Sequence, residues 1–409
     1  GTRFTRGRYL ASSFFICAVI GFPIFATIAF NSMEVNFFTA LIQLMFCFCL
    51  LPEIGREAVS SFKESRVFRV CLVLMGVTVL GWFYLYIPFY GIYRTLVYVV
   101  QIPFFFALLA WFRVKGSDGL TQIFYVKLGV VSIAVLYMIY IYCGQDIDLW
   151  RKMIKGRPPI YRHLRHFNYD LAILIGLSAW LILKDKLSYK TVFGLFFTFG
   201  FLTFWSGARG QLLSLGVFFL LIMLSPQRIY LVRKFHLAVM AFLAGAVALV
   251  LSGETHMLLS SMSRSVEIED FRRISSNRSE IWLATMVYVK DSLAFGYGPE
   301  ALVRLNVWRG GIVQPHNFIV QFLLEFGATG TASILILLIS SACMYISFIL
   351  RKELLGVGLL GGLLMSLMIF ALVDGVFYHI VPITMYLIIA AYVFNIAKSN
   401  TVLKNELNK

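Results

Sequence analysis

Residues 314–350 read QPHNFIVQFLLEFGATGTASILILLISSACMYISFIL. At 1.5 Å per residue, this largely apolar stretch would make a helix of about 50 Å, whereas the hydrocarbon core of a bilayer is about 30 Å thick. We therefore predict that the helix breaks at Gly327 and Gly330. The break would leave a short helix over about 317–326 and a membrane span that begins at about residue 330.

The rest of the chain has the same character. Of its 409 residues 60% are hydrophobic and only 14% are charged, which is too little polar surface for a soluble domain. We predict an all-α polytopic integral membrane protein with about 12 transmembrane helices. The predicted spans lie at about 11–31, 36–52, 70–90, 94–113, 122–143, 168–184, 190–207, 210–225, 234–252, 317–350, 354–373 and 377–397.

The positions of Lys and Arg between the spans predict the orientation of the chain. Basic residues near span ends are held in the cytoplasm, and an inner N-terminus accounts for most of the short basic loops. The long loop between spans nine and ten then lies on the outer side. The predicted organisation is spans one to nine over 1–252, the outer loop over 253–316, and a short polar-striped helix with spans ten to twelve and the tail over 317–409.

The net charge of +16 does not indicate nucleic-acid binding in this protein, because membrane topology accounts for many of the cations. Some cations, however, lie on the predicted outer side, against the insertion bias. They cluster in the loop 144–165 and in the loop 253–316, with Arg209 in a tight turn. They either anchor these loops to lipid phosphate or bind a phosphate or polyanion, and their number favours a binding site.

Polar residues on the short helix indicate where chemistry could occur. Asn317, Gln321 and Glu325 are four residues apart and form one polar stripe that begins at His316. His316 could be a structural residue, but imidazole is suited to proton transfer near neutral pH. Transporters place ionisable groups near the middle of their spans, whereas these groups lie near outer span ends. We therefore predict a catalytic site at the outer interface.

The six cysteines lie within or at the ends of apolar spans, without CxxC or Cys/His metal spacing. The outer loops also lack an acidic cluster suited to a divalent cation. We expect no metal and no cofactor.

Four sequence elements together resemble a known family. They are His316-Asn317 followed by Gly327 and Gly330, the Arg209-x-x-x-Leu213 of WSGARGQLL, Arg278 in NRSEIW, and the glycine-rich turn FGYGPE before the histidine. The pattern is similar to that of the O-antigen ligase, O-antigen polymerase and O-oligosaccharyltransferase superfamily, and most like an O-antigen ligase. Spans one to six carry no such pattern.

The resemblance implies a metal-independent, inverting glycosyltransferase at the periplasmic side of a bacterial inner membrane. Its donor would be an undecaprenyl-diphosphate-linked glycan and its acceptor the lipid A core oligosaccharide. His316 would be the general base, and Arg209 and Arg278 would bind the diphosphate, since a guanidinium fork matches two phosphate oxygens. An O-antigen polymerase, a protein O-oligosaccharyltransferase and, from another class, a polyprenyl-glycan transporter remain alternatives.

The loop WRKMIKGRPPIYRHLRH, residues 150–166, supplies a candidate acceptor site. It carries six basic residues and two histidines on the predicted outer side. Lipid A core is rich in phosphate, so we predict that Arg162 and Arg165 contribute to acceptor binding, with lipid anchoring as the alternative.

Overall fold

The computed structural model describes residues 2–30, 32–85, 89–144, 160–161, 163–255, 259, 278–308 and 312–407. These residues form helices and connecting turns, and no strand occurs among them. Long apolar helices dominate, as the composition predicts for a polytopic membrane protein. The all-α class is therefore confirmed.

The described residues of the first half of the chain form six long helices and the shorter helix α3, which meets α2 at an angle of 88°. Their bounds are α1 Thr2–Ala26, α2 Ser32–Cys49, α3 Leu51–Glu64, α4 Arg66–Tyr84, α5 Phe89–Cys143, α7 Leu164–Leu183 and α8 Tyr189–Ser206. The second half contains α9 Arg209–Met223, α10 Arg228–Ser252, α13 Arg278–Asp291, α14 Ala301–Arg304, α15 Phe318–Ile349, the 3-10 turn η1 Lys352–Leu354, α16 Leu355–Val373 and α17 Ile380–Leu407.

Each predicted span coincides for most of its length with one of these helices. Two of them share α5, whose backbone leaves the helical conformation at Gly116 (φ 51°). By length and composition, eight helices in the described residues could cross a membrane, or nine if the bent pair α2 and α3 counts as one span. The number twelve remains a prediction.

The predicted break in the 314–350 stretch is confirmed at Gly327, whereas Gly330 lies within the helix that follows. Gly327 interrupts α15 with φ 63° and ψ −169°, a conformation that glycine adopts without steric cost. The chain around Ala294–Gly298 fills the break with four backbone hydrogen bonds. Tyr297 and Gly298 donate to the carbonyls of Leu324 and Glu325, and Ala328 and Thr329 donate to those of Leu293 and Ala294. The turn FGYGPE thus docks on the broken helix.

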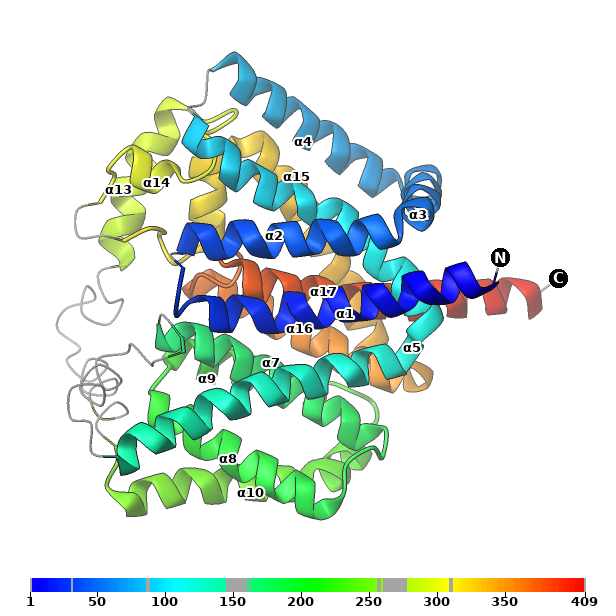
Figure 1. Cartoon of the computed structure of the whole chain (residues 1–409), viewed down its shortest axis with the longest axis vertical. Helices are drawn as coiled ribbons and strands as arrows, with labels where there is room; N and C mark the ends of the chain where they lie inside the picture. Colours follow the sequence, from blue (N-terminus) through cyan, green and yellow to red (C-terminus); the bar gives the residue numbers. More distant parts are fainter. Residues whose placement is uncertain are drawn as a thin grey trace.

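Figure 1 shows how the helices define two ends of the molecule. Helices α13 and α14 lie at one end, which we call the site end. Both chain termini and α3 lie at the opposite end, which we call the terminal end. Helix α7 is the most deeply buried of the long apolar helices in the described residues, because nearly all of its side chains lie inside the protein. Its first turn is at the site end.

The interior of the protein also contains ionisable side chains. Lys127 of α5 and Asp170 of α7 form an ion pair of 2.5 Å, and both side chains are completely buried. Tyr161 also donates a hydrogen bond of 2.8 Å to Asp170. Asp170 is therefore part of the packing that holds α7, because a buried charge requires a partner.

Candidate functional site

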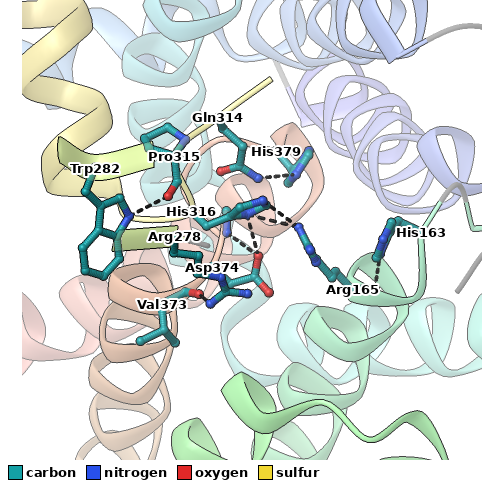
Figure 2. Close-up of polar contacts among 11 residues, drawn as sticks. His163, Arg165, Arg278, Trp282, Gln314, Pro315, His316, Val373, Asp374 and His379 are labelled. Carbon is teal, nitrogen blue, oxygen red and sulfur yellow. Dashed lines mark hydrogen bonds and ion pairs between the residues drawn. The ribbon is translucent and has the colours of Figure 1, made fainter. Parts of the chain in front are cut away.

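His316 lies in the short segment that leads into α15, in a strained conformation. Its φ of 57° is uncommon for a residue with a side chain. Neighbouring contacts hold it there: the Trp282 indole donates a 2.7 Å hydrogen bond to the carbonyl of Pro315. On the other side, Asn317 caps α15 by accepting from the N–H groups of Ile319 and Val320. Figure 2 shows the imidazole at the centre of the resulting polar cluster.

Asp374, at the C-terminal end of α16, faces the imidazole. Its Oδ1 lies 3.3 Å from Nδ1 of His316 and also accepts a 2.8 Å hydrogen bond from the N–H of Gly375. Because a carboxylate only accepts, we assign the ring proton of neutral His316 to Nδ1. The lone pair then lies on Nε2.

Arg165, in the first turn of α7, covers the other side of the imidazole. Its Nη1 lies 2.9 Å from Nε2 and 3.1 Å from Nδ1 of His316. With the proton on Nδ1, the guanidinium donates to the lone pair of Nε2. Arg165, which we predicted to contribute to acceptor binding, is thus in direct contact with the candidate base. Arg162, the other residue of that prediction, lies outside the described residues.

Arg278 lies in the first turn of α13 as the structure describes it. Its guanidinium donates to the carbonyl of Val373, the neighbour of Asp374 (Figure 2). Its Nε is buried without a hydrogen-bond partner in the structure. Arg209 begins α9, and Gly210 beside it packs against Phe370 and Val373 of α16. Arg165, Arg209 and Arg278 therefore approach the end of α16 from three helices.

The electrostatics of the cluster favour a neutral histidine beside an ionised aspartate. Burial lowers the pKa of His316 below its ordinary value of 6.5, and the charges of Arg165 and Arg278 act in the same direction, although Asp374 opposes them. Burial alone would raise the pKa of Asp374, but its hydrogen bond with His316 and the nearby arginine charges hold that pKa below its usual range. Near neutral pH His316 can accept a proton.

Burial also lowers the pKa of Arg278, and the charges of Arg165 and Arg209 add to this effect while Asp374 opposes it. Arg165 and Arg209 are thus close enough to act on Arg278, with Asp374 as the carboxylate beside it. Their shared positive charge is suited to a group with more than one negative charge.

A second polar group lies next to His316 and includes residues that carry no recognisable motif. Gln314 Nε2 lies 3.2 Å from Nε2 of His379, and the rings of His166 and His379 are 4.2 Å apart. Burial lowers the pKa of His379 well below its ordinary value, with the neighbouring His166 acting in the same direction. For both His379 and Asp374, the sequence offers only one signal, their position near the end of a span.

The predicted stripe of Asn317, Gln321 and Glu325 has a different setting from the one we expected. Asn317 caps its own helix, and Gln321 Nε2 lies 3.4 Å from Glu325. Glu325 in turn accepts a 3.0 Å hydrogen bond from the N–H of Glu300. Gln321 and Glu325 therefore connect the stripe to the loop that contains Glu300.

Glu300 belongs to a buried cluster that fixes this loop to α5. Nε of Arg94 lies 3.6 Å from Oε1 of Glu300, and the Tyr378 hydroxyl donates a 2.8 Å hydrogen bond to Oε2. The Arg94 guanidinium also lies over the rings of Tyr378 and Tyr98, at 4.3 and 4.9 Å. Arg94 is thus a buried internal contact and not an exposed binding group.

No group of three or more His, Cys, Asp or Glu side chains in the described ranges is arranged to hold a metal ion. The positive charge next to His316 comes from arginine side chains.

Residues 193–335 match the family model described as O-antigen ligase. The matched region contains Arg209, Arg278 and His316, while Arg165 and Asp374 lie on either side of it. No curated protein matches the chain.

Proposed function

We propose that the protein is an O-antigen ligase, on the premise that its residues 193–335 match the family model described as O-antigen ligase. The family supports glycosyl transfer in general. In our proposal the donor is an undecaprenyl-diphosphate-linked glycan and the acceptor is the lipid A core oligosaccharide. The site end faces the periplasm of a bacterial inner membrane, with twelve spans and the large loop between spans nine and ten.

The observation that carries the proposal is the arrangement around one imidazole. His316 has a carboxylate on Nδ1, a lone pair on Nε2 and three arginines nearby. A base of this kind suits removal of a hydroxyl proton, and the arginines suit a departing diphosphate. A transporter requires neither feature.

The chemical step is a single displacement with inversion. Nε2 of His316 accepts the proton of an acceptor hydroxyl while its oxygen forms a bond to the anomeric carbon of the donor. The bond between that carbon and the diphosphate oxygen breaks, and the electron pair leaves with the diphosphate. Asp374 stabilises the imidazolium that forms, and Arg278 and Arg209 stabilise the added negative charge.

Arg165 occupies the position that the acceptor hydroxyl must take at Nε2. Binding of the acceptor would therefore displace the guanidinium from the imidazole and free it for a phosphate of lipid A core. This step accounts for the predicted contribution of Arg165 to acceptor binding. In that case Arg165→Gln raises the KM for phosphorylated acceptor and matters less for a dephosphorylated core.

The proposal is tested by supplying purified protein with polyprenyl-diphosphate-linked glycan and one acceptor at a time. We expect lipid A core to gain sugar. Extension of a second polyprenyl-linked glycan alone would identify a polymerase, and glycosylation of a protein acceptor alone would identify an O-oligosaccharyltransferase. Movement of the donor across the membrane without any glycosidic product would identify a transporter.

A further inference from the structure

Helix α3 lies far from the candidate site and crosses the end of the helix bundle. It follows α2 after a break at Leu50, and the two helices meet at an angle of 88°. Figure 1 shows α3 at the terminal end, where both ends of the chain also lie. A helix perpendicular to a membrane-spanning neighbour lies along the membrane surface.

The polarity of α3 is inverted relative to a helix of a soluble protein. Its polar residues face the protein: Glu57 is buried and accepts a 2.7 Å hydrogen bond from Arg113 of α5. Lys398 of α17 donates a 2.8 Å hydrogen bond to Ser60 and lies 3.2 Å from Glu64. Ion pairs and hydrogen bonds thus attach α3 to the bundle.

The opposite side of α3 is apolar and exposed. Leu51, Val59 and Phe62 are 58%, 54% and 47% exposed, and at 100° per residue they fall within about a quarter of the helix circumference. In water such a stripe would cost about 25 cal/mol for each Å² of apolar surface. The stripe therefore needs an apolar environment.

The charged residues of α3 also differ between its two sides. Arg56 and Lys63 are exposed at the edge of the apolar stripe, whereas Glu57 and Glu64 are paired with cations of the bundle. Arg66 and Arg69 at the start of α4 are also exposed. The exposed side thus combines apolar residues with uncompensated cations, which matches the acyl chains and headgroups of anionic phospholipid.

We propose that α3 is an interfacial helix that binds anionic phospholipid in the leaflet at the terminal end. Leu51, Val59 and Phe62 enter the acyl region, and Arg56 and Lys63 bind the headgroup phosphates. A second copy of the chain would cover the apolar stripe but would place the same cations against one another, so the charge pattern favours lipid. The inference does not depend on the proposed function.

The first test measures depth in the membrane. Val59→Cys and Phe62→Cys are each labelled with a nitroxide, after replacement of the native cysteines, and placed in nanodiscs that contain phosphatidylglycerol and hold one protein each. We expect both labels to be more accessible to oxygen than to a water-soluble nickel complex. Asp118→Cys is the matched control, because the Asp118 side chain is 88% exposed at the same end and should favour the nickel complex. Equal nickel access at all three positions would overturn the proposal, as would labels at 59 and 62 that become protected only with two copies per disc.

The second test measures headgroup preference in detergent. An environment-sensitive fluorophore on Phe62→Cys is titrated with phosphatidylglycerol or phosphatidylcholine. We expect half-saturation at a several-fold lower concentration of phosphatidylglycerol, and loss of that difference in the Arg56→Gln/Lys63→Gln variant. Val59→Leu is the control that should keep the difference. The same half-saturation for both lipids would contradict binding to anionic headgroups.

Discussion

His316 and Asp374 lie 3.3 Å apart, nitrogen Nδ1 to oxygen Oδ1, although one residue precedes α15 and the other follows α16. The contact couples the two groups electrostatically. It keeps Asp374 ionised and fixes the proton of the imidazole on the nitrogen that faces away from the proposed acceptor. The pair therefore determines both the direction and the basicity of the candidate base.

Asp374→Asn should reduce transfer at least ~10-fold, because an amide can hold the imidazole in the wrong tautomer and does not stabilise the imidazolium. The carboxylate raises the pKa of His316, so its loss lowers that pKa further. The unprotonated base is the active form, and activity therefore rises with pH through this pKa. We expect the midpoint of the acidic limb of kcat/KM, which lies below pH 6.5 in the wild type, to move to lower pH. An unchanged midpoint and rate would show that Asp374 does not act on His316.

Arg165→Gln should move the same midpoint in the opposite direction. The guanidinium lowers the pKa of His316, and its neutralisation allows that pKa to rise. Arg165→Lys is the control, since it keeps the charge and should leave the midpoint closer to that of the wild type. A shift to lower pH in Arg165→Gln would contradict the assigned arrangement.

Arg209→Lys and Arg278→Lys should each reduce turnover about 10²-fold, because a point charge does not reproduce a guanidinium fork on a diphosphate. Arg233→Lys, an exposed position in the second turn of α10, should retain normal turnover. Initial rates with and without EDTA complete the measurement. Normal turnover in both site variants, or loss of wild-type activity in EDTA, would assign the diphosphate to other groups.

Gly327→Ala should destabilise the protein by roughly 1–3 kcal/mol through backbone strain alone. The residue has φ 63°, and an added Cβ would lie 2.5 Å from the backbone of Ala294. The comparison is with Gly216→Ala in α9, where an added Cβ meets no atom within 4 Å. Thermal unfolding in detergent should show a lower Tm for Gly327→Ala only. Equal Tm values would mean that the break in α15 does not need glycine.

The sequence predicts the all-α class and the break at Gly327 because both follow from local properties: apolar length and the conformational freedom of glycine. The number of membrane crossings does not follow from such local properties. Helices α8 and α9 coincide with predicted spans, but they are not among the helices that are long and apolar enough to cross a membrane.

The site is only partly predictable for the same reason. His316, Arg209 and Arg278 belong to motifs, whereas Asp374 is brought to His316 by the packing of α15 and α16. The stripe of Asn317, Gln321 and Glu325 follows from helical spacing, but the partner of Glu325 comes from the loop at Glu300. Spacing along one helix predicts a shared face and does not identify what packs against it.

The central claim is that His316 accepts the proton from the acceptor. It is tested most directly by the single-turnover rate of His316→Ala in proteoliposomes with polyprenyl-diphosphate-linked glycan and lipid A core. We predict a loss of ~10²–10⁴ in rate with unchanged Tm and unchanged donor binding. His236→Ala, at an exposed position of α10, should retain the wild-type rate. A near-normal rate in His316→Ala would contradict the account.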